Sequence, residues 1–271
     1  MKSSKNLINL KKRLLAGIGT PNKVTFEIDN FQKQAIELVT AGEDTLVVAP
    51  TGSGKTFIAL TAIESILEQR QKAVYTTPLK ALSNSKYLEL KARFEPRFKV
   101  GILTGDRKIQ SDADVVVATT EIYRNELYRS SERFSLVVLD EVHYISDPQR
   151  GPVWEESIIL TPQFSTLLML SASISNSKQI AGWISEVRGK KCKIVIKEDR
   201  PVELRFGFLH PELGILPLKN DRGETLLEIQ RFYSYSRDSG EGATSGWRKR
   251  SGYRNSSNQN FGRRRRRRKG V

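Results

Sequence analysis

Cysteine, histidine and long apolar runs are scarce in this sequence of 271 residues, and each scarcity excludes a class of protein. The single cysteine, Cys192, excludes an intramolecular disulfide framework and a cysteine-rich zinc site, which fits a reducing, cytoplasmic compartment. Only two histidines are present, so a histidine-based metal site is not expected. No apolar run approaches the roughly 20 residues that a membrane-spanning helix needs, so we expect a soluble protein.

Acidic residues are scarce near the C-terminus. Residues 231–271 hold 13 basic and 2 acidic side chains and carry +11 of the formal net charge of +15, which leaves a near-neutral globule with a cationic appendage. From residue 234 onward there is no Leu, Ile or Met, so residues 234–271 are predicted to be a disordered Ser/Gly/Arg-rich tail or linker. Arginines interleaved with aromatic residues favour RNA binding there, and a solvated linker is the alternative.

The N-terminal extension, residues 1–25, is also basic. Its first 20 residues have five basic and no acidic side chains, and Leu7, Leu10 and Leu14 recur at helical spacing. This pattern predicts a short amphipathic helix on the surface of the domain. The alternative is an organelle transit peptide.

Between these ends, short β-branched apolar runs alternate with helical segments. Runs that are continuously apolar indicate strands buried on both faces, and helices between them indicate parallel crossovers, so we expect a doubly wound, mostly parallel α/β sheet. The predicted strands are Thr45–Ala49, Ala73–Thr77, Val100–Leu103, Val115–Ala118, Leu136–Leu139, Thr166–Leu170 and Lys193–Ile196. The predicted helices include Lys55–Gln69, Leu79–Phe94 and Asn176–Val187. An exit segment, residues 206–233, follows, with an extended stretch at Glu203–Phe208 and a short helix at Glu224–Phe232.

A phosphate-binding loop follows the first predicted strand. It consists of Ala49, Pro50, Thr51, Gly52, Ser53, Gly54, Lys55 and Thr56 and opens a helix. Glycines let backbone N–H groups close around a phosphate, and the helix N-terminus adds positive potential. Lys55 is expected to reach the β- and γ-phosphates, and the Thr56 hydroxyl to ligate Mg²⁺. Ala49 stands where the general pattern has Gly.

Two adjacent carboxylates end a later strand. Asp140 and Glu141 follow Leu136–Leu139, and because parallel strands end at one rim, they are expected beside the phosphate loop. Asp140 is predicted to hold Mg²⁺, and Glu141 to orient and deprotonate the attacking water. His143 contacts either the phosphate region or an opposing domain, or it is a structural histidine.

Several further motifs resemble those of DExH-box helicases of superfamily two, and most closely the superkiller-like RNA helicases. The shared DExH-box motifs are Asp140–His143, Ser171–Ser173 and Thr77–Asn84. Those that favour the superkiller-like group are Phe26–Gln32, Gly101–Asp106, Thr119–Arg124 and Arg150–Glu156. The resemblance implies a RecA-like ATP-binding domain over residues 26–205.

The resemblance also implies roles for single residues. Gln32 would read the adenine edge with Phe26 near the base. Taken alone, Gln32 is more often a solvated helix residue, and the downstream phosphate loop favours the adenine contact instead. His143, Ser171 and Ser173 would couple hydrolysis to strand movement, with Ser173 standing where the family has Thr. Arg150 and Trp154 either face RNA or buttress the carboxylate loop. The residues expected to line the single-stranded RNA track are Pro78, Lys80, Thr104, Gly105, Thr119, Thr120 and Arg124.

Helicases of this family have two RecA-like domains, and the second supplies arginine fingers. The sequence has no second sheet after Arg200, so we expect a truncated, split or fragmentary gene product. The predicted function is the ATP-binding half of an ATP-dependent RNA helicase, which binds Mg-ATP and RNA and hydrolyses ATP when another chain supplies the second domain. The alternatives are an RNA-binding or annealing protein that acts through its tail, and a DNA-directed translocase.

Overall fold

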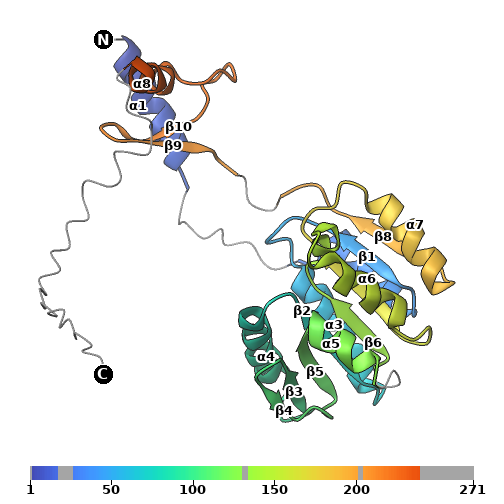
Figure 1. Cartoon of the computed structure of the whole chain (residues 1–271). Coiled ribbons are helices and arrows are strands. Elements are labelled where there is room, and N and C mark those ends of the chain that lie inside the picture. The colour runs from blue at the N-terminus through green and yellow to red at the C-terminus, as the bar shows by residue number, and fades with distance from the viewer. Residues whose placement is uncertain (1, 18–26, 130–133, 201–203, 239–271) are drawn as a thin grey trace, which may run out of the picture. The chain divides into compact units, whose positions relative to one another are not determined.

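An eight-stranded sheet forms the centre of residues 23–203, the larger of the two units into which the chain divides (Figure 1). The computed structural model describes residues 2–17, 27–129, 134–200 and 204–238. The sheet strands are β1 (Thr45–Val48), β2 (Ala73–Thr77), β3 (Val100–Leu103), β4 (Lys108–Ile109), β5 (Val115–Thr119), β6 (Leu136–Leu139), β7 (Thr166–Ser171) and β8 (Lys193–Ile196). Their order is β4-β3-β5-β2-β6-β7-β1-β8, and all pairs are parallel except β3 with β4.

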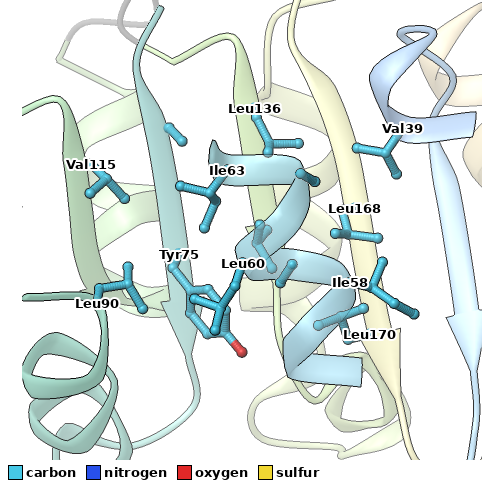
Figure 2. Packing of buried hydrophobic residues seen from close by; sticks show 14 of the residues in the cluster. Val39, Ile58, Leu60, Ile63, Tyr75, Leu90, Val115, Leu136, Leu168 and Leu170 are labelled. Carbon is cyan, nitrogen blue, oxygen red and sulfur yellow. The ribbon is translucent and has the colours of Figure 1, made fainter. Parts of the chain in front are cut away.

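Helices cover both faces of this sheet. They are α2 (Asn30–Thr40), α3 (Lys55–Glu68), α4 (Lys80–Phe94), α5 (Thr120–Leu127), α6 (Gly151–Leu160) and α7 (Ser177–Arg188), with a 3₁₀ turn η1 (Val142–Ser146). One buried cluster joins the strands to α2, α3 and α4, and a second joins them to α5, α6 and α7. Figure 2 shows α3 lying across the first face, where Ile58 and Ile63 pack among Leu136, Leu168 and Leu170. Burial on both faces explains why the strands are apolar without alternation.

The predicted α/β fold with a mostly parallel sheet is confirmed, and it is consistent with a RecA-like domain. Each predicted strand is present with an end shifted by at most one residue. Strand β4 was not predicted, because it contains only two residues and both are exposed. The N-cap of α2, Asp29, accepts a hydrogen bond from Phe31 N and forms a capping box with Gln32, which fixes where the helix starts.

A buried ionic cluster closes the sheet at the ends where the parallel strands begin. Asp44, fully buried before β1, accepts hydrogen bonds from Arg188 Nε at 2.9 Å and from Leu167 N at 2.8 Å. Arg188, at the end of α7, is 1% exposed and also donates to the backbone oxygens of Pro162 and Ser165. Because every charge in this cluster has a partner, its burial is tolerated.

The one cysteine of the chain lies just before β8. Cys192 is buried, and this burial raises the pKa of its thiol to about 12. Since the thiolate is the reactive form of cysteine, this thiol is inert at neutral pH.

Residues 1–22 and 204–271 make up the second unit, which is described here by itself. Its elements are α1 (Lys2–Leu15), β9 (Gly207–His210), β10 (Gly214–Pro217) and α8 (Leu227–Asp238), and β9 pairs with β10 in an antiparallel hairpin. Leu10 of α1 is buried with Leu216, Leu226 and Ile229. Arg205 Nη1 donates to the backbone oxygens of Arg13, Leu14 and Ala16 at the end of α1, where a helix leaves carbonyl groups in need of donors.

The predicted N-terminal helix is present in this second unit and packs on β10, because its leucines share a core with residues some 200 positions later. Three other expectations are corrected. The extended stretch predicted at Glu203–Phe208 is displaced to β9, and α8 replaces the helix predicted at Glu224–Phe232. Residues 234–238, predicted to be disordered, form the last turns of α8, since no Pro or Gly interrupts them. The rest of the predicted tail lies outside the described residues, and no helix among the described residues is long and apolar enough to cross a membrane.

Candidate ATP and nucleic-acid site

Six neighbouring parallel strands deliver their C-terminal ends to one rim of the sheet. In the spatial order β3-β5-β2-β6-β7-β1, the residues at or directly after these ends are Thr104, Thr119, Pro78, Asp140, Ser171 and Ala49. The rim therefore has two halves. The β6-β7-β1 half carries the residues predicted to bind ATP, and the β3-β5-β2 half carries those predicted to contact RNA. Ligands bind at this rim in open α/β sheets.

The phosphate loop connects β1 to α3 with two glycines in left-handed conformation. Gly52 has φ 85° and Gly54 has φ 87°, which turns successive backbone N–H groups toward one place. A Cβ at Gly54 would lie 2.3 Å from Gln32 Nε2, so a larger residue would require Gln32 to move. Ser53 Oγ is buried in the loop without a hydrogen-bond partner. These features fit a bound phosphate group.

Gln32 is 4% exposed and is tied to the phosphate loop rather than solvated. Its Nε2 donates to Ser53 O at 3.0 Å, and its Oε1 accepts from Asp29 N at 3.0 Å. The alternative of a solvated helix residue is therefore wrong. Adenine recognition by Gln32 stays a prediction, and Phe26 lies outside the described residues.

Asp140 and Glu141 emerge from β6 next to β2. Asp140 Oδ1 accepts from Glu141 N at 2.9 Å, and Oδ2 accepts from the Tyr75 hydroxyl at 2.7 Å. Glu141 has φ 54°, a left-handed conformation that non-glycine residues seldom adopt and that is concentrated at functional sites. Glu141 Oε2 is buried and accepts no hydrogen bond from any residue that the structure describes, although His143 Nδ1 lies 3.2 Å away. An unpaired buried carboxylate oxygen is suited to accept a proton from water.

Lys55 links the loop to these carboxylates electrostatically. Its Nζ donates to Ala49 O at 2.7 Å and to Pro50 O at 3.2 Å, so it lies folded over the loop. Burial lowers the pKa of Lys55, while the negative charges of Glu141 and Asp140 act in the opposite direction. The cation and the two predicted catalytic carboxylates thus share one site, as their positions in the sequence predicted.

Thr56 and Asp140 are the residues predicted to hold Mg²⁺, and this role stays a prediction. Among the described residues there is no group of three or more His, Cys, Asp or Glu side chains suited to a metal ion. Mg²⁺ is usually held by one or two protein oxygens together with water and phosphate. Thr56 Oγ1 accepts a hydrogen bond from Lys86 Nζ at 3.1 Å, a contact that the sequence analysis missed.

The residues after the carboxylates form an aromatic stack. His143 stacks on Tyr144 with ring centroids 4.8 Å apart, and Tyr144 stacks on Trp154 at 5.5 Å. Trp154 is fully buried, so of the two alternatives for it, the buttress of the carboxylate loop is right and the RNA-facing position is wrong. Arg150 lies over the Tyr144 ring at 5.4 Å. His143 remains partly exposed, with the exposed fraction of its side chain at 39%.

The predicted RNA track gathers on the other half of the rim. Lys80 Nζ lies 3.3 Å from Asp106 Oδ1, and the Thr104 hydroxyl donates to the same oxygen at 2.9 Å. A Cβ at Gly105 would lie 3.7 Å from Lys80 Nζ, so these residues are neighbours. Thr104 and Thr119 are each 5% exposed, which leaves mainly backbone and the Lys80 cation at the surface.

Two of the predicted RNA contacts are occupied within the protein. Thr120 is fully buried and its hydroxyl donates to Thr77 O at 3.2 Å, so its side chain joins α5 to β2 and does not face solvent. Arg124 Nη1 pairs with Glu156 at 2.8 Å, and its side chain is 25% exposed. The sequence analysis missed Glu156 as a partner because α5 and α6 meet only through the fold.

Ser171 is the last residue of β7 and Ser173 follows the strand, beside the phosphate loop. Ser171 is fully buried, and its backbone oxygen accepts from Ala49 N at 3.0 Å. The Ser171 hydroxyl lies 3.5 Å from Ser173 O, at the limit of a hydrogen bond. The Ser171–Ser173 segment is thus attached to the start of the loop, while its role in coupling stays a prediction.

Comparison with known proteins supports the resemblance. The DEAD/DEAH box helicase family matches residues 29–180. The chain is 46% identical over 185 residues to the probable helicase HelY of Mycobacterium leprae, covering 67% of this chain and 20% of that protein. It is 45% identical over 207 residues to the chloroplastic DExH-box ATP-dependent RNA helicase DExH15 of Arabidopsis thaliana, covering 73% and 17%. It is 44% identical over 189 residues to the ATP-dependent RNA helicase mtr4 of Schizosaccharomyces pombe, covering 69% and 17%.

A solved structure has a similar fold. The DUF1998 helicase MrfA bound to DNA superposes with a TM-score of 0.53 at 21% identity, covering 69% of this chain and 29% of that one. The chain spans about a fifth of the length of the curated relatives it matches. From the family match over residues 29–180 and the identities above 40%, the chain belongs to the DEAD/DEAH box helicase family, with relatives among the Ski2- and Mtr4-like DExH-box RNA helicases and HelY.

Proposed function

We propose that this chain is the ATP-binding half of an ATP-dependent RNA helicase. It binds Mg-ATP on the β6-β7-β1 half of the rim and single-stranded RNA on the β3-β5-β2 half. It hydrolyses ATP when a second RecA-like domain, on another chain or on a further part of the same protein, completes the site. The observation that carries the proposal is the convergence of Lys55, Asp140 and Glu141 at one rim, beside a loop shaped by Gly52 and Gly54.

The chain's own residues account for binding and proton transfer. The loop N–H groups and Lys55 bind the phosphates, and Gln32 is placed to contact the base while it braces Ser53. Thr56 and Asp140 would hold Mg²⁺, which neutralises charge on the phosphates when bound. Glu141 Oε2, which accepts no hydrogen bond from the described residues although His143 Nδ1 lies 3.2 Å away, orients the attacking water and accepts its proton.

The RNA half of the rim suits binding without base recognition. Lys80 offers a cation, and Gly105 brings backbone close to it. Such contacts bind the sugar-phosphate backbone of any sequence. RNA rather than DNA is proposed because two of the relatives are described as RNA helicases.

The decisive experiment is ATP hydrolysis by the whole chain with and without single-stranded RNA, at fixed salt. RNA-stimulated turnover is expected to fall by about 10²–10⁴ in Glu141→Gln, because a general base is lost. Lys55→Ala is expected to abolish nucleotide binding. The matched control is Glu155→Gln, on an exposed position of α6, which should behave as wild type.

Each other outcome has a meaning. Nucleotide binding without turnover would show that the second domain is required, and the assay would be repeated with that domain added. Unwinding of a duplex by the lone chain would contradict the need for a partner. Stronger stimulation by DNA than by RNA would favour a DNA-directed translocase, and loss of all RNA binding on deletion of residues 234–271 would favour a protein that acts through its basic tail.

A further inference from the structure

Tyr75 lies at the junction between the two halves of the rim. It belongs to β2, the last strand of the RNA half, and β2 pairs with β6, the first strand of the ATP half, with Tyr75 opposite Val138. The side chain is fully buried in the cluster under α3, where Figure 2 shows its ring among the apolar residues and its hydroxyl at the end of the side chain. A buried tyrosine has one polar side-chain group, its hydroxyl, which needs a hydrogen-bond partner.

The hydrogen-bond partner of this hydroxyl is Asp140. The Tyr75 hydroxyl donates to Asp140 Oδ2 at 2.7 Å, and Glu141 N donates to Oδ1 at 2.9 Å, so each carboxylate oxygen is held by one donor. Each carboxylate oxygen retains a second lone pair for a metal ion or its water.

Tyr75 is also near Thr56, because Lys86 contacts both residues. Lys86, on α4, has its Nζ 5.6 Å from the Tyr75 ring centroid and 3.1 Å from Thr56 Oγ1. Tyr75 is therefore in contact with Asp140 directly and is near Thr56 through Lys86. These are the two side chains to which the proposed function gives the metal.

We propose that Tyr75 is a positioning residue for the metal site: its hydroxyl fixes the orientation of Asp140 so that the carboxylate is ready to receive Mg²⁺ with the nucleotide. The inference rests on the proposed function, since it concerns the same site. Partners that orient a ligating carboxylate typically change metal affinity by about 10- to 100-fold when removed.

The test measures nucleotide affinity rather than turnover. Binding of fluorescent ADP to the whole chain is titrated in Mg²⁺ and in EDTA, and the ratio of the two affinities reports the metal site. Tyr75→Phe keeps the ring and removes only the hydroxyl, so the Mg²⁺ ratio is expected to fall by about 10-fold or more while binding in EDTA is unchanged. For Tyr75→Phe, half of the Mg²⁺ effect on ADP binding should require a correspondingly higher Mg²⁺ concentration.

The chain offers a matched control pair. Tyr87, on α4, is likewise buried and has a lysine, Lys91, over its ring at 5.8 Å, but no contact with Asp140 or Thr56 is found for either residue in the described part of the chain. Tyr87→Phe should leave the Mg²⁺ ratio as in wild type. Asp140→Asn should lower the affinity ratio to one, so that Mg²⁺ no longer strengthens nucleotide binding. Adding Tyr75→Phe to Asp140→Asn should cause no further change in the ratio, because the hydroxyl acts through Asp140.

The outcomes separate the inference from the proposed function. If wild type gains affinity from Mg²⁺ and Tyr75→Phe gains as much, Tyr75 does not position the metal site and the inference is overturned while the function stands. An effect of Tyr75→Phe that persists in the Asp140→Asn background would also overturn it, since a general packing defect behaves that way. If wild type gains nothing from Mg²⁺, the function and the inference fail together.

Discussion

Gly54 combines two constraints that no larger residue satisfies. Its φ of 87° is left-handed, and a Cβ would lie 2.3 Å from Gln32 Nε2. Gly54→Ala is therefore expected to lower the free energy of unfolding by about 1–2 kcal/mol from backbone strain alone. It should also displace Gln32 from Ser53 and weaken nucleotide binding. Urea denaturation and nucleotide titration measure the two effects.

The control for this prediction is Gly182→Ala on α7. Gly182 lies in a helix, is exposed, and a Cβ there meets nothing within 4 Å. The substitution should raise the free energy of unfolding by about 0.5–1 kcal/mol through helix propensity. A Gly54→Ala variant with wild-type nucleotide affinity would show that Gln32 can move aside without consequence.

At the residue scale, the charged and glycine-rich motifs could be predicted from the sequence, whereas their buried hydrogen-bond partners could not. The sequence predicted Lys55 because it directly follows a glycine-rich loop. It predicted Asp140 and Glu141 because two adjacent carboxylates end a buried strand. Tyr75 was missed because, within the apolar run Ala73–Thr77, it reads as an ordinary core residue. Only the pairing of β2 with β6 brings its hydroxyl to Asp140.

Arg188 holds several elements together at the rim opposite the site. It connects the end of α7 to Asp44 before β1 and to the turn between α6 and β7. Arg188→Ala would leave Asp44, fully buried, with only Lys190 at 3.0 Å as a charged partner. The free energy of unfolding should fall by about 3–5 kcal/mol, as for other buried pairs that lose one member.

An exposed ion pair provides the comparison. Arg97 pairs with Glu68 at 2.9 Å, but their side chains are 61% and 51% exposed. Arg97→Ala should change the free energy of unfolding by about 1 kcal/mol or less. Equal losses from Arg188→Ala and Arg97→Ala in denaturant titrations would mean that the Asp44 cluster is hydrated.

At the element scale, length decided what could be predicted. Each strand of the sheet except β4 was predicted because a run of four to six residues that is mostly apolar and β-branched, with helical segments between the runs, is typical of a buried strand. The short hairpin β9–β10 was predicted only as a displaced extended stretch and a loop, because its strands contain Gly207, Gly214 and Pro217, which are typical of turns. The end of α8 was misplaced because polar residues continue a helix without any apolar pattern.

The two units have separate cores, so they should respond separately to mutation. Leu10 is 7% exposed and packs with Leu216, Leu226 and Ile229, far in sequence from the sheet. Leu10→Ala is expected to destabilise the smaller unit by about 2–5 kcal/mol, enough to unfold so small a core. Nucleotide affinity should not change. Hydrogen exchange of the α1 and β10 amides, followed with nucleotide titration, measures both.

The matched control lies on the same helix. Ile8 is 51% exposed, so Ile8→Ala should leave hydrogen exchange in the smaller unit nearly unchanged. Weakened nucleotide binding in Leu10→Ala would contradict the independence of the two cores.

At the scale of the whole molecule, the sequence did not predict which segments share a unit. Leucines at helical spacing predicted α1, but not its partner, because an amphipathic face does not specify what covers it. The partner, β10, lies some 200 residues away. Contacts between segments that lie some 200 residues apart leave no pattern in the local sequence.

That arrangement has a consequence for folding during synthesis. A ribosome releases α1 first, yet the strand and helix that bury Leu10 are made only after the whole of residues 23–203. The sheet domain, complete in sequence by then, is able to fold while α1 waits with its leucines uncovered. The smaller unit is therefore the last to form. In a growing chain, α1 is an exposed amphipathic segment available to chaperones until translation passes residue 229.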